Sequence, residues 1–263
     1  MLKLFLCLLL ILSLESNCQS LFDSKYEPVE GKIIGIWPHN DRFQSTKKLN
    51  ELKTRWGFNY ILLAEIYSEK ELLLLKNSGY DSLHVMYQVI LENNMESFNV
   101  LKNKLFNLGK LWAYYFDEPL SKEQPFIQIL GLFSELSNNT FYPHANFIVS
   151  EVDEYKAQKF IRVADKITYS GYGKSDKFCV DQIQTWHEWK NYLGNTFSML
   201  WISANEDSDE YKILLKAAKE LNINSIWLYA LEPIETGKEV NDSNYKNFCD
   251  AAVEFGFMKA KSN

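Results

Sequence analysis

The sequence lacks the features by which proteins usually bind nucleic acids and metal ions. Its 263 residues carry a net charge of −6 and contain no basic run before the short tail at 259–261. Because a nucleic-acid surface needs clustered Lys and Arg, we expect no nucleic-acid partner. The four histidines and four cysteines do not stand at the spacings typical of metal ligands, so we expect no metal site and no cofactor.

Two catalytic signatures are also missing. No Gly-x-Gly-x-x-Gly follows the first expected strand at 32–37, where a dinucleotide-binding fold would need its phosphate loop. The sequence has no Gly-x-Ser-x-Gly elbow and no suitably spaced pair of catalytic histidines. A dinucleotide-binding enzyme, an esterase and a phosphodiesterase are therefore all disfavoured.

Long apolar runs are absent after the N-terminus. Within residues 1–20, a single lysine precedes the apolar run 4–14, which is typical of a signal peptide and short for a membrane span. The sequence is compatible with cleavage after Cys18 or after Ser20, and residues 14–18 also resemble a bacterial lipobox, which would make Cys18 a lipid-modified N-terminus. We therefore predict an exported protein, secreted, periplasmic or lipid-anchored at the cell surface, whose only membrane contact would be a lipid on Cys18.

Few cysteines remain beyond that segment. Cys179 and Cys249 are the two that follow residue 20. An oxidising compartment permits a bridge between them, but two cysteines far apart in a sequence are more often small buried apolar residues. We expect two buried thiols, with a disulfide as the alternative.

The sequence does contain a regular alternation of short apolar segments with helical patterns. The expected strands are 32–37, 59–64, 82–89, 111–116, 145–150, 166–170, 196–203 and 225–231, and the expected helices are 43–56, 68–78, 95–108, 121–136, 153–163, 177–193, 207–221 and 243–255. Four of the helices are followed by glycine, at Gly57, Gly79, Gly109 and Gly194. Eight strand–helix pairs predict a single (β/α)8 TIM barrel, of the α/β class, over residues 21–263. An open doubly wound sheet uses the same alternation and is the alternative.

The fourth expected strand carries the most informative motif. Residues 111–116 are apolar or aromatic, as in a buried parallel strand, and the run stops at Asp117 and Glu118. Pro119 ends the strand, and Ser121 begins a Ser-x-x-Gln capping box that would start the next helix. Two like charges at the end of an apolar strand are costly unless something pairs or uses them. We therefore predict a functional role for both carboxylates.

In a barrel, the carboxyl ends of the strands meet on one face, where TIM-barrel active sites lie. Carboxylates and aromatic rings dominate that face, without the cluster of Lys and Arg that would bind a phosphate. A neutral polyol fits such a surface, because rings stack on sugars and carboxylates accept hydroxyl protons. Core packing of the rings and the helix dipole beside Glu151 are the ordinary alternatives. The predicted substrate-binding residues are Trp37, Glu65, Tyr67, Gln88, Tyr115, Glu151, Tyr172, Trp201, Tyr229 and Glu232.

A resemblance to a known family rests on residues 115–119, Tyr-Phe-Asp-Glu-Pro. An aromatic-x-Asp-Glu-Pro ending of the fourth strand resembles the barrel glycoside hydrolases, and the adjacent Asp-Glu pair is most similar to the substrate-assisted N-acetylhexosaminidases. The resemblance implies that Glu118 is the general acid and that Asp117 orients the acetamido group of the substrate. A tyrosine that completes the acetamido pocket in that family has no motif here, and Tyr172 and Tyr229 are candidates by position only.

The seventh expected strand departs from the retaining glycosidases that place a nucleophilic Glu at its end. Residues 201–204, Trp-Ile-Ser-Ala, offer no carboxylate there, and Glu206 comes a few residues late. Three alternatives follow. The first is a substrate-assisted hydrolase, and the second is an inverting hydrolase with Glu151, Glu65 or Glu232 as base. The third is a noncatalytic carbohydrate-binding barrel on the cell surface.

Overall fold

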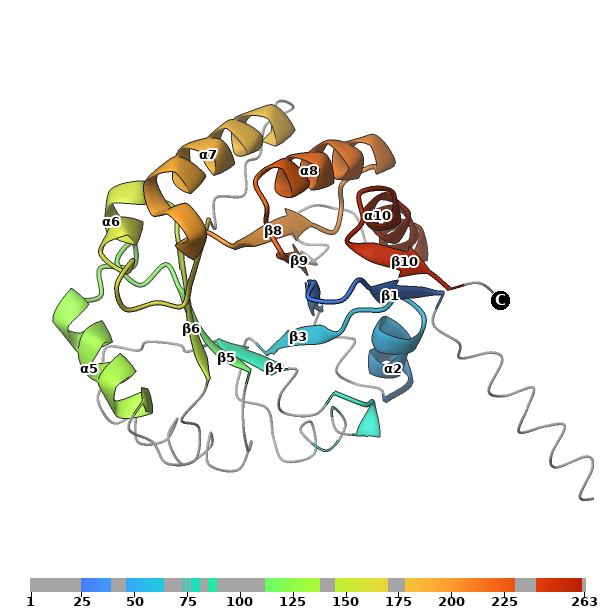
Figure 1. Ribbon diagram of the computed structural model, residues 1–263. Coiled ribbons are helices and arrows are strands. Elements are labelled where there is room, and N and C mark those ends of the chain that lie inside the picture. The colour runs from blue at the N-terminus through green and yellow to red at the C-terminus, as the bar shows by residue number, and fades with distance from the viewer. Residues whose placement is uncertain are drawn as a thin grey trace, which may run out of the picture.

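Eight parallel strands form a nearly closed barrel (Figure 1). The structure, a computed structural model, describes residues 25–38, 46–63, 73, 75, 77–80, 85–88, 112–137, 145–169, 178–229 and 240–261, with residues 87, 88 and 178–180 described by their backbone only. The strands are β2 (Ile33–Trp37), β3 (Tyr60–Leu63), β4 (Val85–Gln88), β5 (Ala113–Asp117), β6 (Asn146–Glu151), β7 (Lys166–Tyr169), β8 (Met199–Ser203) and β9 (Ser225–Tyr229). Their order is β7-β6-β5-β4-β3-β2-β9-β8, and a parallel bridge between Ile167 and Phe197 joins β7 to the segment before β8. The TIM-like barrel is thereby confirmed in place of an open doubly wound sheet.

Helices lie around the outside of the barrel (Figure 1). They are α2 (Thr46–Thr54), α5 (Phe126–Ser137), α6 (Glu154–Gln158), α7 (Phe178–Leu193), α8 (Ser208–Glu220) and α10 (Asp242–Glu254), with a short 3-10 helix, η3 (Gly194–Thr196), after α7. The glycine after α2 is required by its conformation, because Gly57 has a φ of +73° and a Cβ there would lie 2.5 Å from the carbonyl oxygen of Tyr26. The helix predicted at 95–108 lies outside the described residues.

Two helices, α5 and α6, differ from their predicted bounds by about five residues at one end. The segment after β5 forms turns, and α5 begins at Phe126, directly after Pro125. The capping box predicted at Ser121 is therefore wrong, because the Ser121 hydroxyl donates to the distant carboxylate of Glu151 at 2.6 Å. The helix predicted at 153–163 starts as expected after the N-cap Asp153, but α6 ends at Gln158 because the next N–H groups bond to carbonyls three residues back.

A two-stranded antiparallel ribbon joins the two ends of the described chain. It consists of β1 (Tyr26–Pro28) and β10 (Met258–Ala260), which lies directly after α10 (Figure 1). The Tyr26 hydroxyl donates to Asp250 on α10 at 2.7 Å, which ties the ribbon to the helix layer. The sequence does not indicate this ribbon, because its strands are very short and carry Pro and Lys rather than an alternating apolar pattern.

Strand alternation divides the core into two layers. One face of each strand packs against the helices, and the other face fills the barrel interior with a separate apolar cluster that includes Tyr115, Trp201 and Trp227. Trp227 lies against the bare backbone of Gly35 on β2, where a Cβ would come within 2.2 Å of the indole ring. Position 35 therefore requires glycine, because the Trp227 ring occupies the space that a Cβ would fill.

Cys249 on α10 is buried and forms no disulfide. Its thiol donates to the carbonyl oxygen of Trp56 at 3.4 Å, which is the buried role predicted for it. The side chain of Cys179 and residues 1–20, including Cys18, lie outside the described part of the chain. Among the helices that the structure describes, none is long and apolar enough to cross a membrane.

Candidate functional site

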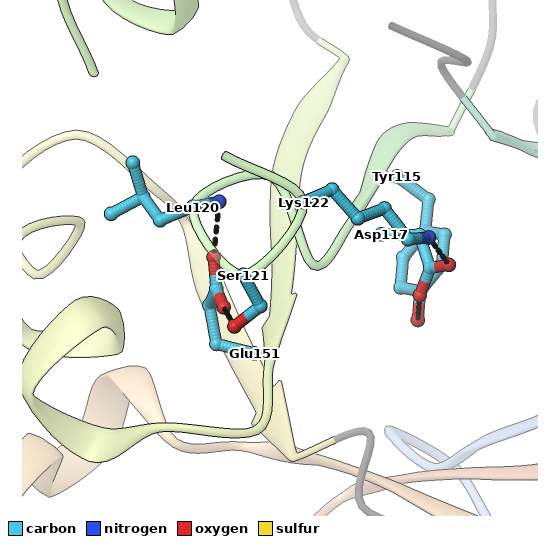
Figure 2. Close-up of polar contacts among 6 residues, drawn as sticks. All are labelled: Tyr115, Asp117, Leu120, Ser121, Lys122 and Glu151. Atoms are coloured by element: carbon cyan, nitrogen blue, oxygen red, sulfur yellow. Dashed lines mark hydrogen bonds and ion pairs between the residues drawn. The ribbon is translucent and has the colours of Figure 1, made fainter. Parts of the chain in front are cut away.

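Asp117 ends β5 on the inner face of the barrel. Its inward direction follows from strand alternation, because Tyr115, two residues earlier, belongs to the interior cluster. The Tyr115 hydroxyl also donates a hydrogen bond to Asp117 Oδ1 at 3.3 Å. Lys122 approaches from the following turn and places its Nζ 2.5 Å from Asp117 Oδ2 (Figure 2). The Asp117 side chain stays 21% exposed. The carboxylate is thus held by two neighbours and still reaches solvent at the carboxyl end of the strand.

Glu118 directly follows and adopts a backbone conformation that is unusual for its type. Its φ is +50°, in the left-handed region that costs a residue other than glycine on the order of 1 kcal/mol or more. The conformation is fixed at both ends, since the Glu118 N–H donates to the Ser150 carbonyl at 2.9 Å and the Glu118 carbonyl accepts from the Lys122 N–H at 2.8 Å. This turn brings Lys122 back over Asp117.

Glu151 ends β6 but faces the helix layer. It is fully buried, and its two oxygens accept from the Leu120 N–H at 2.7 Å and from the Ser121 hydroxyl at 2.6 Å. Figure 2 shows this group lying apart from the Asp117–Lys122 pair. Burial raises the pKa of Glu151, although these two hydrogen bonds oppose the shift. The structure thus gives Glu151 a place in the support of the β5–α5 turn rather than the predicted contact with substrate.

Four of the predicted aromatic residues do meet. With Trp227 they form what we call the aromatic cluster: Trp37, Tyr115, Trp201, Trp227 and Tyr229. Ring centroids are 4.7 Å apart for Trp37 and Tyr229, and 6.1 Å apart for Trp37 and Trp201. Trp201 also lies 5.6 Å from Tyr115 and 5.5 Å from Trp227. The cluster joins β2, β8 and β9 to the strand that carries Asp117.

The other predicted substrate-binding residues are not placed by the structure. Glu65, Tyr67, Tyr172 and Glu232 lie outside the described residues. Gln88 is described by its backbone, which ends β4 and pairs in parallel with Tyr115. Their roles stay predictions.

Two hydroxyl residues that were not predicted from the sequence also face the barrel interior. Ser150 on β6 pairs in register with Asp117, and Thr168 on β7 pairs with Ser150. We call Asp117, Ser150 and Thr168 the polar row. Ser150 and Thr168 are fully buried, and neither hydroxyl has a hydrogen-bond partner. The sequence carried no clear signal for them, because hydroxyl residues are common on strands and both strands hold other polar residues.

A further carboxyl group lies after β8. Glu206 stands immediately before Asp207, the N-cap of α8, and forms side-chain hydrogen bonds with Ser203 and Glu210. Burial and the neighbouring Glu210 raise the pKa of Glu206 to about 8, against the opposing hydrogen bond from Ser203. The raised pKa favours the protonated form of Glu206, which disfavours it as the charged nucleophile of a retaining glycosidase. Within the described residues, no three His, Cys, Asp or Glu side chains gather into a group that could hold a metal ion.

No protein-family model matches the sequence, and no curated protein sequence matches it. Solved structures share its fold. The chain is similar to an active-site mutant of Rhizomucor miehei β-1,3-glucanosyltransferase in complex with laminaritriose, with a TM-score of 0.55, 14% identity, and coverage of 80% of this chain and 91% of that one. A glycoside hydrolase family 17 β-1,3-glucanosyltransferase from the same organism gives a TM-score of 0.54 at 11% identity, over 78% of this chain and 90% of that one.

An enzyme of another class is equally similar. A putative aldo-keto reductase from Pseudomonas aeruginosa gives a TM-score of 0.54 at 10% identity, over 87% of this chain and 97% of that one. Because glycoside hydrolase and reductase barrels match equally well at such low identity, the likeness shows the fold alone. The fold is one that glycoside hydrolases use.

Proposed function

We propose that the protein is an exported glycoside hydrolase acting on a carbohydrate or glycoconjugate, with Glu118 as general acid and Asp117 as the residue that orients the substrate. One observation carries the proposal: a carboxylate stands on the inner face of β5, at its carboxyl end, beside the aromatic cluster. Rings that stack on sugars and a carboxylate that accepts hydrogen bonds are what a sugar site requires. The fold shared with β-1,3-glucanosyltransferases is compatible with this function.

The chemistry follows the substrate-assisted route. Glu118 donates its proton to the glycosidic oxygen as the bond to the anomeric carbon breaks, and the carbonyl oxygen of the substrate's acetamido group bonds to that carbon. Asp117 accepts a hydrogen bond from the acetamido N–H, and Lys122 holds Asp117 in place from 2.5 Å. Water then attacks the anomeric carbon and gives a proton to Glu118. This attack breaks the bond between the anomeric carbon and the acetamido oxygen, so the acetamido group is restored.

A noncatalytic sugar-binding barrel is the second candidate. The observation that favours it is the lack of a second inward carboxylate on the described strands: β8 ends in Ser203, and Glu151 is committed to the β5–α5 turn. An inverting enzyme based on Glu151 is disfavoured by the same contacts. Glu65 and Glu232 stay candidates for that role as predictions from the sequence.

Hydrolysis of aryl glycosides and polysaccharides by the purified protein tests the proposal. The panel includes N-acetylglucosaminide and N-acetylgalactosaminide, and Glu118→Gln and Asp117→Asn are assayed beside the wild type. We expect turnover of an N-acetyl sugar to fall by roughly 100-fold or more in both variants. The matched control is Glu123→Gln, because Glu123 is exposed, lies in the same turn and also has a positive φ of 61°.

Each other outcome has a defined meaning. Turnover that Glu118→Gln leaves unchanged removes Glu118 as the acid. Sugar binding without turnover of any substrate favours the noncatalytic barrel. If the protein neither binds nor turns over any sugar, a carbohydrate function is contradicted. The mass of the mature protein tests export separately.

A further inference from the structure

We propose that Ser150, Thr168 and the indole N–H of Trp201 form a buried subsite that binds hydroxyl groups of a neutral sugar entering past Asp117. The inference rests on the proposed function, because it assigns ligand contacts inside the same barrel mouth. It adds Ser150 and Thr168, which the sequence did not indicate, gives Trp201 a specific contact, and narrows the ligand to an uncharged sugar.

The geometry of the strands aims these groups into the barrel. Ile148 belongs to the interior cluster, so Ser150, two residues further along β6, faces the same way. Thr168 pairs with Ser150, and Asp117 pairs with Ser150 from the other side. Because barrel strands are tilted, register partners lie at successive depths along the barrel axis. The polar row therefore leads from the partly exposed Asp117 to two fully buried hydroxyls.

The hydrogen-bonding capacity of these groups is unused. Ser150 Oγ, Thr168 Oγ1 and Trp201 Nε1 are buried and have no partner. A second tryptophan in the same interior shows the contrast, since Trp227 Nε1 donates to Ser225 Oγ at 3.0 Å. Buried polar groups without partners are rare in folded proteins because each loses its hydrogen bonds to water. Three of them face the barrel interior, and one, Ser150, lies in register with Asp117, which suggests that a ligand completes the set.

The kinds of groups define the ligand. The two hydroxyls both donate and accept, the indole donates and Asp117 accepts, which matches the hydroxyl groups of a sugar. An anion would meet the like charge of the partly buried Asp117 carboxylate and is disfavoured. Lys166, lower on β7, attracts an anion only weakly, because burial lowers its pKa and favours the neutral amine, whose Nζ donates to Ser198 Oγ at 3.3 Å. The subsite therefore favours neutral sugars over uronic acids.

The test combines stability with binding in Ser150→Ala and Thr168→Val. Both variants remove a buried hydroxyl with little change of shape, so we expect the free protein to melt at the same temperature or up to about 4 °C higher. Sugar binding should weaken by roughly 3- to 10-fold in each. Ser225→Ala is the matched control, since its hydroxyl already has a partner, and it should lower the melting temperature.

The neutral probes are methyl glucoside, methyl galactoside and N-acetylglucosamine, and the two methyl glycosides are compared with their uronic acid counterparts. Binding of each is titrated by tryptophan fluorescence. We expect at least one neutral probe to bind more tightly than the acids. Binding that neither variant weakens overturns the subsite and leaves the proposed hydrolase standing. A lower melting temperature in both variants also overturns it, because the hydroxyls then have a partner, such as a trapped water, in the free protein. Tighter binding of the uronic acids, or no binding of any probe, contradicts the subsite. The proposed hydrolase activity is tested separately, by the panel of aryl glycosides and polysaccharides.

Discussion

The two sides of the barrel interior are built from opposite kinds of residue. The side made by β2, β8 and β9 is filled by the large rings of Trp37, Trp201, Trp227 and Tyr229. The arc made by β5, β6 and β7 carries the polar row, whose buried members are small and hydroxylated. Rings exclude water and stabilise the fold, whereas small unpaired hydroxyls contribute nothing to it. We therefore expect substitutions on the ring side to change stability most, and substitutions in the polar row to act mainly on the proposed sugar binding.

The largest effect is expected on the ring side, at Gly35. Gly35→Ala places a Cβ within 2.2 Å of the Trp227 indole, which the rest of the aromatic cluster holds in place. We expect a loss of about 3 kcal/mol in the free energy of unfolding, because the overlap is relieved only by moving a packed ring. Urea unfolding followed by tryptophan fluorescence measures it.

Gly131→Ala is the control for this change. Gly131 lies in α5, is exposed and has nothing within 4 Å of its would-be Cβ. There alanine should stabilise the protein by about 0.5 to 1 kcal/mol, because glycine is a poor helix former. If both substitutions change stability alike, Trp227 does not fill the barrel as described.

A medium effect is expected on the polar side, at Glu151. Glu151→Ala leaves the Leu120 N–H and the Ser121 hydroxyl without their acceptor, which should cost about 2 kcal/mol. Because the same turn carries Lys122, sugar binding or turnover should fall as well. Urea unfolding and the glycoside panel measure the two effects, and Ser121→Ala, which breaks one bond only, should cost less. Equal stability of Glu151→Ala and wild type would show that the turn does not depend on this carboxylate.

Local pattern predicted the fold well. The eight strands were found in the sequence because each is a short apolar run bounded by turn signals, and the position of Asp117 followed from where the apolar run stops. The direction of a side chain at a strand end was harder. Glu151 looked like Asp117 in the sequence, yet its place one residue further along the alternation turns it to the helix layer.

Contacts between distant residues were not predictable. The Ser121 hydroxyl had two possible partners, its own helix start or a carboxylate thirty residues away, and only the packing of β6 against the turn decides between them. The ribbon of β1 and β10 is also a contact between chain ends, with too little local pattern to indicate it. Ser150 and Thr168 drew no attention because hydroxyl residues are common on strands, and only the missing partners distinguish them.

The smallest effect is expected at Glu206, at the end of the ring-side strand β8, and it depends on pH. The fold raises the pKa of this carboxyl from its ordinary 4.5 to about 8, so the fold favours the protonated form. Its contribution to stability is therefore complete below about pH 4.5 and is lost as the pH rises through about 8. Glu206→Gln, which stays neutral, should match the wild type near pH 5 and be more stable than it above about pH 8, by an amount that solvent screening of this partly exposed group keeps small. Urea midpoints at both pH values measure this, with Glu220→Gln on the exposed face of α8 as the control. If the wild-type urea midpoint is not lower at the higher pH, or if the control variant gains as much stability, Glu206 is ionised in the fold without cost.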